Sequence, residues 1–72
     1  MQDKIRITTP YITLGQLLKE AAVADTGGMV KIILAEYNIF VNDEHEERRG
    51  RKVYPGDRVE VEDTGTFIVE RA

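Results

Sequence analysis

The sequence predicts one small α+β domain, in which a helical hairpin packs on a small, mostly antiparallel β-sheet. Three observations support this prediction. The chain has 72 residues, which leaves room for one hydrophobic core only. Apolar residues recur at helical spacing in two segments of the first half of the chain. In the second half they alternate with polar residues between turns. We therefore treat residues 1–72 as a single domain.

The first third of the chain predicts a strand and then a helix. Residues 4–8 alternate polar and β-branched side chains, with Ile5 and Ile7 on one side, until Pro10 ends the strand. A helix begins after Thr13, because its hydroxyl and the side chain of Gln16 have the spacing of a capping box. Apolar residues at positions 14, 17, 18 and 21 then form a stripe on one face, and the helix ends near residue 22.

A second helix is expected from Gly27 to about Glu36, capped by Asp25 or Thr26. Gly27 and Gly28 in its first turn each cost about 1 kcal/mol relative to alanine, so some other factor should offset them. Either this turn packs closely against the first helix, or its exposed N–H groups form a positive helix end suited to a phosphate. Both can hold together. The two helices share an apolar face and form a helical hairpin.

The second half of the chain predicts the remaining strands. These are expected at residues 38–41, from residue 53, at 58–61 and at 66–69. Asn42-Asp43 forms a turn, and Pro55 followed by Gly56 fits the two central positions of a type II turn. Residues 44–52 form a charged excursion from the sheet. The apolar faces of the last two strands are expected to close on the helices.

The inventory of reactive side chains argues against an enzyme. The chain contains neither serine nor cysteine, which removes the two commonest nucleophiles of acyl transfer and any thiolate metal site. Its one histidine, His45, lies among adjacent carboxylates without the i, i+4 spacing of metal ligands on a helix. No Walker-type phosphate loop and no calcium-loop spacing occur. We therefore expect no catalytic residue, no metal site and no cofactor.

The distribution of apolar residues predicts a protein without membrane contact. No apolar run approaches the roughly 18 residues that a membrane-spanning helix needs. The first residues also lack the basic-then-apolar layout of a signal peptide. We expect a soluble, cytoplasmic monomer.

The arrangement of charge singles out one segment. Ten Lys and Arg residues against thirteen Asp and Glu residues give a net charge of −3, which disfavours a protein that coats nucleic acid indiscriminately. Four of the ten basic residues nevertheless fall within residues 48–52. Because exposed charges more than about 8 Å apart are largely screened at physiological salt, this patch can act on phosphate despite the negative total. Alternatively, Glu46 and Glu47 pair with these cations across a surface loop.

The order of these elements resembles a known family. The combination of four features is more specific than any one of them: a capped helix, a second helix, Val41-Asn42 at a turn, and the run from Pro55 to Val61. Residues 13–61, about two-thirds of the chain, carry this pattern. They resemble the S-four-like RNA-binding domain, first described in ribosomal protein S-four and also called the αL motif. Residues 26–31 and 48–52 are further similar to the compact bacterial branch known as YaaA, in which the domain is essentially the whole protein.

The resemblance implies a non-catalytic protein that binds structured RNA, usually ribosomal or transfer RNA, through the helical hairpin and the adjoining β-loop. It assigns RNA contacts to the second helix, the turn asparagine and the basic loop: Thr26, Gly27, Gly28, Lys31, Asn42, Arg48, Arg49, Arg51 and Lys52. The chain departs from the family at two of its cationic positions. Thr13 replaces the arginine that usually opens the first helix, and Gly27 stands where a basic residue is often found. Fewer phosphate contacts therefore remain than in a typical member.

Two other classes of protein are compatible with parts of the pattern. A protein-interaction module could use residues 48–52 against an acidic protein partner. A ubiquitin-like sulfur carrier has a similar arrangement of turns, but its chemistry requires a C-terminal Gly-Gly, whereas the last residues here are Val69 to Ala72. Tyr37 and Phe40 are either stacking partners for a base or ordinary core and surface residues. RNA binding remains the main prediction, and an interaction module is the alternative.

Overall fold

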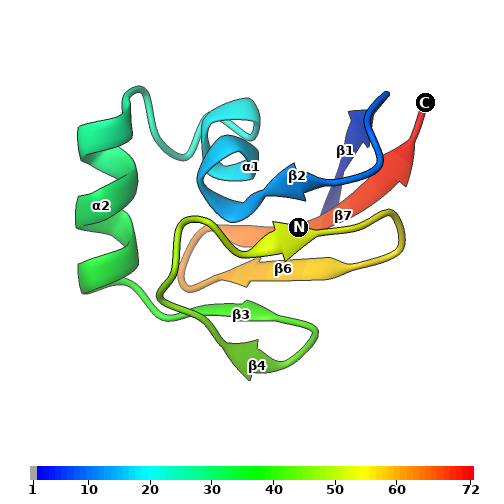
Figure 1. The fold of residues 1–72 in the computed structure, drawn as a ribbon. Helices are drawn as coiled ribbons and strands as arrows, with labels where there is room; N and C mark the ends of the chain where they lie inside the picture. The colour runs from blue at the N-terminus through cyan, green and yellow to red at the C-terminus, as the bar shows by residue number, and fades with distance from the viewer. Residues whose placement is uncertain (1) are drawn as a thin grey trace.

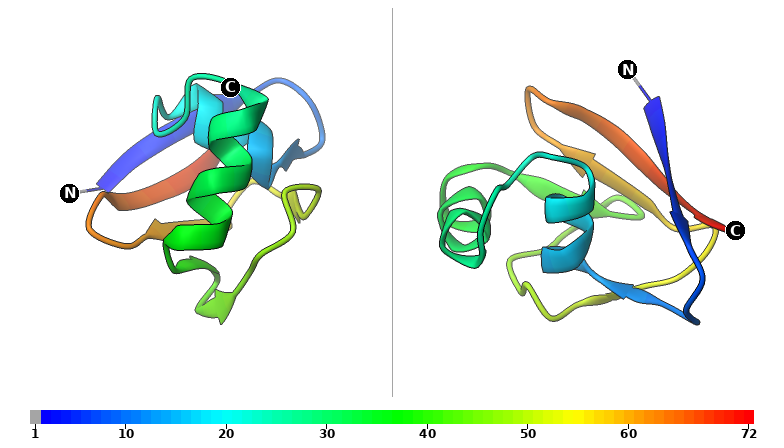
Figure 2. Two further views of the ribbon diagram at one scale, coloured as in Figure 1. Left: turned by 90° about the vertical axis from the view of Figure 1, so that its left-hand side faces the viewer. Right: turned by 90° about the horizontal axis from the view of Figure 1, so that it is seen from above.

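A computed structural model describes residues 2–72 and has the predicted α+β architecture (Figure 1). Two helices, α1 (Leu14–Glu20) and α2 (Gly27–Glu36), lie on one side of the main sheet (Figure 2). The strands are β1 (Gln2–Ile7), β2 (Ile12–Thr13), β3 (Ile39–Val41), β4 (Glu44–His45), β5 (Lys52–Val53), β6 (Arg58–Val61) and β7 (Gly65–Arg71).

The main sheet has the strand order β1-β7-β6-β3-β4. Its neighbouring strands are antiparallel except β1 and β7, which run parallel with Ile5 opposite Val69. These two strands, blue and red, lie side by side in both views of Figure 2. The prediction of a small, mostly antiparallel sheet is therefore confirmed.

A second, two-stranded sheet pairs β2 with β5, which the sequence did not predict. In it Ile12 lies opposite Val53, and Thr13 lies opposite Lys52. β4 extends the main sheet by pairing with β3. The segment predicted as a charged excursion, residues 44–52, therefore begins and ends in a strand. A two-residue strand is too short to show an alternating pattern, which is why the periodicity of the sequence missed β2 and β4.

The backbone confirms both predicted turns. Asn42 and Asp43 have φ angles of 50° and 70°, as in a two-residue type I′ hairpin between β3 and β4. Gly56 has a φ of 96°, and the N–H of Asp57 donates to the carbonyl of Tyr54 at 2.9 Å, as in a type II turn. A residue with a Cβ would be strained at position 56.

Threonine hydroxyls cap both helices. Thr13 Oγ1 accepts from the N–H of Gln16 at 3.3 Å, and the Gln16 side chain accepts from the N–H of Thr13, which confirms the capping box. Thr26, and not Asp25, caps α2, and its hydroxyl accepts from the N–H of Met29 at 3.2 Å. These contacts satisfy first-turn donors that have no acceptor inside a helix.

One hydrophobic core lies between the helices and the main sheet. The predicted helix stripes and the inner faces of the last strands are buried in it: Leu14, Leu17, Leu18, Val30, Ile33, Leu34, Val59, Val61, Phe67 and Val69. Each fully buried leucine or valine side chain contributes about 1.5–3 kcal/mol to folding. In the part of the chain that the structure describes, neither helix is long and apolar enough to cross a membrane.

Candidate nucleic-acid interface

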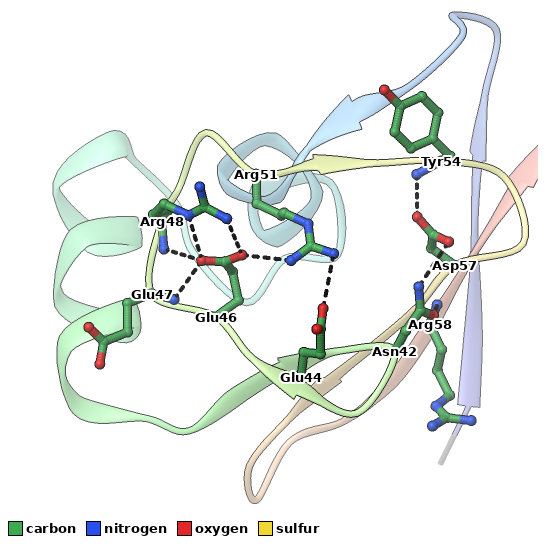
Figure 3. A network of polar contacts seen from close by, with 9 residues as sticks. All are labelled: Asn42, Glu44, Glu46, Glu47, Arg48, Arg51, Tyr54, Asp57 and Arg58. Atoms are coloured by element: carbon green, nitrogen blue, oxygen red, sulfur yellow. Dashed lines mark hydrogen bonds and ion pairs between the residues drawn. The ribbon is translucent and has the colours of Figure 1, made fainter.

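A buried carboxylate, Glu46, organises the basic loop, residues 46–52. Its side chain is only 6% exposed, although it lies in a highly charged part of the chain. Arg48 donates to it from Nε at 3.0 Å and from Nη2 at 3.1 Å, and Arg51 donates from Nη1 at 2.8 Å (Figure 3). The backbone N–H groups of Glu47 and Arg48 add hydrogen bonds of 3.1 and 3.0 Å. The buried charge is thus well compensated, which is the condition under which proteins tolerate one.

These contacts keep the carboxylate of Glu46 ionised. Hydrogen bonds from the Arg48 side chain are the main cause of its strongly lowered pKa; burial opposes them, and the hydrogen bond from Arg51 adds to the lowering. Hydrogen bonds to Glu46 in turn raise the pKa values of Arg48 and Arg51. At neutral pH the cluster is therefore a fixed network of charges that holds the shape of the loop.

Only one of the two glutamates before the arginines pairs with them. Glu46 holds Arg48 and Arg51, and Arg51 also approaches Glu44 at 3.6 Å. Glu47 is exposed and forms no ion pair with any residue between positions 2 and 72. The interpretation of the loop as a set of ion pairs therefore holds for Glu46 alone.

The other cations of the loop point to solvent. Arg49 and Lys52 are exposed, and neither has a carboxylate partner among the residues that the structure describes. Arg48 remains 77% exposed despite its contacts with Glu46. The loop consequently presents three cationic side chains outward, on a backbone that the buried carboxylate holds in place.

The basic loop is fixed to the start of α1 through the backbone. The N–H groups of Leu14 and Gly15 donate to the carbonyls of Arg51 and Arg49 at 2.8 and 2.9 Å. A Cβ at position 15 would lie 3.4 Å from the Cβ and the carbonyl oxygen of Arg49 and from Cγ1 of Val30. A Cβ would therefore just fit at position 15, and the loop and α2 leave no room for a larger side chain there.

Lys31 and Arg49 come together from different elements. With Glu47 and two apolar residues of α2, they line an open surface hollow of about 310 Å³ between the helix and the basic loop. Lys31 lies one helical turn after Gly27, so both are on the same face of α2. Like Arg49, Lys31 pairs with no carboxylate of the described chain. An anion in this hollow would meet these two cations beside the second half of α2, together with the carboxylate of Glu47.

The glycines at the start of α2 do not serve close packing. A Cβ at Gly27 would meet no atom within 4 Å in the described part of the chain, and one at Gly28 would meet only Thr26 Oγ1, at 3.7 Å. The explanation that this turn packs tightly against α1 is therefore wrong. Both glycines are exposed, and their N–H groups have no acceptor within the helix. This helix end stays accessible to an anion from solvent.

Asn42 lies away from the hollow, on the far side of Arg51 from α2 (Figure 3). Its Nδ2 donates to Asp57 Oδ1 at 3.0 Å, and its Oδ1 accepts from the N–H of Arg58 at 2.9 Å. Asp57 also accepts from the N–H of Tyr54 at 2.8 Å. The Asn42 side chain therefore ties the β3–β4 turn to the turn before β6, and its assignment as an RNA contact stays a prediction.

Two residues that shape this surface were not predicted as site residues. Glu46 was considered only as a partner in a surface loop, because its burial depends on how the loop folds back on α1. Gly15 carried a usable signal, since a single glycine inside a helical pattern often marks a close approach. Among residues 2–72, no three His, Asp or Glu side chains are placed to hold a metal ion.

Comparisons with known proteins agree with this architecture. A family model described as S4 domain matches residues 5–70. The chain is also similar to the Bacillus subtilis (strain 168) protein named "Probable ribosome maturation protein RlbA". The two are 54% identical over 69 residues, which cover 96% of this chain and 97% of that protein. Because the family match spans both helices and nearly all of the strands, the chain belongs to the S4 domain family.

Proposed function

We propose that this protein is a non-catalytic, cytoplasmic RNA-binding protein that contacts the phosphates of structured RNA through α2 and the basic loop. Its membership of the S4 domain family supports RNA as the ligand. The name of the similar Bacillus subtilis protein, a probable ribosome maturation protein, favours ribosomal over transfer RNA. The observation that carries the proposal is the hollow in which Lys31 and Arg49 meet.

The geometry suits recognition from outside an RNA helix. A-form RNA has a narrow major groove that side chains do not enter, so a small domain contacts phosphates and overall shape. A guanidinium can donate two parallel hydrogen bonds to one phosphate, and Arg49 is exposed for this, whereas Arg48 already donates from Nε and Nη2 to Glu46. The N–H groups of Gly27 and Gly28 add uncharged donors at the positive end of α2.

The local balance of charge favours an anionic ligand even though the chain carries −3. The surface formed by α2 and the loop has five cationic side chains, Lys31, Arg48, Arg49, Arg51 and Lys52, against four glutamates at positions 36, 44, 46 and 47. If four of these cations contact phosphates, log K falls with log salt at a slope of about −3. Binding of this kind is weak and depends strongly on ionic strength.

The proposal is tested by an NMR titration of the labelled protein with a ribosomal RNA helix–loop fragment at two salt concentrations. We expect the largest shifts at residues 26–31 and 48–52, and these shifts should weaken as salt rises. The variant Arg49→Glu should lose most of the affinity and keep its thermal stability, because Arg49 makes no ion pair in the described chain.

The matched control is Arg71→Glu, which changes the net charge by the same amount at the exposed end of β7. It should leave the affinity nearly unchanged. An absence of shifts at low salt, or equal losses in both variants, would contradict the proposal. Binding of an acidic protein to the loop in place of RNA would instead support the alternative, an interaction module.

A further inference from the structure

The short sheet formed by β2 and β5 has one buried and one exposed face. Ile12 and Val53, which lie opposite each other, are 7% and 0% exposed and belong to the core. Side chains alternate between the faces of a strand, so the flanking pair of residues lies on the other face. This pair is Tyr11 and Tyr54, which are 38% and 48% exposed. The sheet thus displays two aromatic rings on the side away from the core.

The two tyrosines form a cluster with a cation. Their ring centroids lie 5.7 Å apart at an interplanar angle of 51°, and Lys52 Nζ lies 5.1 Å from the centroid of the Tyr11 ring. Tyr54 lines an open hollow with Arg48, Gly50, Arg51 and Lys52. The aromatic cluster is therefore continuous with the basic loop.

Packing within the protein does not account for this arrangement. Neither tyrosine belongs to the hydrophobic core of the described chain, and both leave a large part of their surface in water. Exposed aromatic rings beside arginine and lysine are the features on which proteins stack unpaired RNA bases, because every base has a flat π-face and is followed by a phosphate. The cluster combines both requirements within a few residues.

We propose that Tyr54, with Tyr11 beside it, is a stacking site for an unpaired base, and that Lys52 holds the phosphate next to that base. The proposal rests on the proposed function, and it specifies more closely which RNA the protein binds. The favoured RNA is a helix that continues into an unpaired nucleotide, with the helix on α2 and Arg49 and the unpaired base on the tyrosines. A continuous duplex would leave the aromatic cluster unused.

The test compares two RNA hairpins with the same stem, which is closed by a non-nucleotide linker so that neither RNA has an unpaired base in its loop. One is blunt, and the other has a four-nucleotide single-stranded overhang that contains the fluorescent base 2-aminopurine. Stacking on an aromatic side chain strengthens binding by about 5-fold or more per base, so the wild type should bind the overhang hairpin at least about 5-fold more tightly. The 2-aminopurine fluorescence should also fall on binding, as it does when this base stacks.

The variant Tyr54→Leu keeps an apolar side chain at the position and removes the π-face. We expect it to bind both hairpins equally and to leave the 2-aminopurine fluorescence unchanged. The matched control is Tyr54→Phe, which keeps the π-face at the same position and should keep the preference of the wild type. Thermal unfolding of each variant confirms that the comparison is made on folded protein.

The outcomes separate this proposal from the one on which it rests. If the wild type binds both hairpins with the same affinity, or if Tyr54→Leu weakens both by the same factor, the stacking site is refuted and RNA binding stands. If the wild type binds neither hairpin at low salt, the proposed function fails, and the stacking site fails with it. A preference that disappears only in Tyr54→Leu supports the site.

Discussion

Glu46→Gln tests whether the buried carboxylate holds the basic loop in place. The substitution keeps the shape of the side chain and one acceptor oxygen, but it removes the charge. The oxygen at the Oε2 position can still accept from the two backbone N–H groups and from Arg48 Nε. At the Oε1 position an amide group would face Arg48 Nη2 and Arg51 Nη1, which are donors themselves. Two hydrogen bonds to a charged acceptor are therefore lost.

The expected loss of stability follows from the exposure of the two donors. A hydrogen bond to a charged group contributes about 1.5–3 kcal/mol when it is shielded from water. Arg51 is 27% exposed, so most of this contribution applies to it. Arg48 is 77% exposed and can turn to water, so its bond adds little to this loss. We expect a destabilisation of roughly 2 kcal/mol, which lowers the Tm of a domain of this size by about 8–16 °C.

Thermal and urea unfolding at neutral pH, followed by circular dichroism, measure this difference. Glu47→Gln is the matched control, because Glu47 is the next residue, is exposed and has no ion-pair partner in residues 2–72. It should change stability by no more than about 0.5 kcal/mol. If Glu46→Gln is as stable as the wild type, or if both variants lose the same amount, the loop does not depend on the buried carboxylate.

The stability lost in Glu46→Gln should also depend on pH. The pKa of Glu46 in the folded protein lies well below its ordinary value of 4.5, mainly because Arg48 donates to the carboxylate. Its contribution to stability is therefore complete above about pH 4.5 and is lost as the pH falls through the folded pKa. The difference in stability between the wild type and Glu46→Gln should be constant near neutral pH and should shrink below pH 4.5.

Two further predictions concern glycines. Gly27→Pro should keep the helix, because proline is accepted at the first helical position and Thr26 already has an extended backbone. The substitution removes one N–H, so it should weaken RNA binding a few-fold in the NMR titration. Gly27→Ala, its control, should retain RNA binding and raise stability by up to about 1 kcal/mol, since a Cβ meets no atom of the described chain there. At Gly15, alanine should change stability by less than about 1 kcal/mol, whereas leucine should cost about 1–3 kcal/mol in urea unfolding because it displaces Arg49 or Val30. Equal stability of the leucine variant and the wild type would contradict close packing at position 15.

The elements that the sequence predicted correctly are those in which the signal is local. The capping box at Thr13, the turn at Pro55-Gly56 and the alternation of residues 58–61 each depend on contacts or backbone angles within a few residues. The helical hairpin followed from periodicity for the same reason. The family resemblance then assigned the RNA contacts to α2, the basic loop and Asn42, and these contacts stay predictions.

The features that only the tertiary structure decided depend on residues far apart in the chain. In the sequence Glu46 stands among other charged residues, and nothing local indicates that it is buried. Its burial follows because the backbone carbonyls of Arg49 and Arg51 accept hydrogen bonds from the first turn of α1, which folds the loop back onto the protein. Tyr11 and Tyr54 become neighbours only because β2 pairs with β5 across about forty residues of sequence. Local propensity determined which residues form helices, turns and longer strands. Long-range pairing decided which charges are neutralised inside the protein and which groups remain exposed on its surface, because burial and contact are properties of the whole fold.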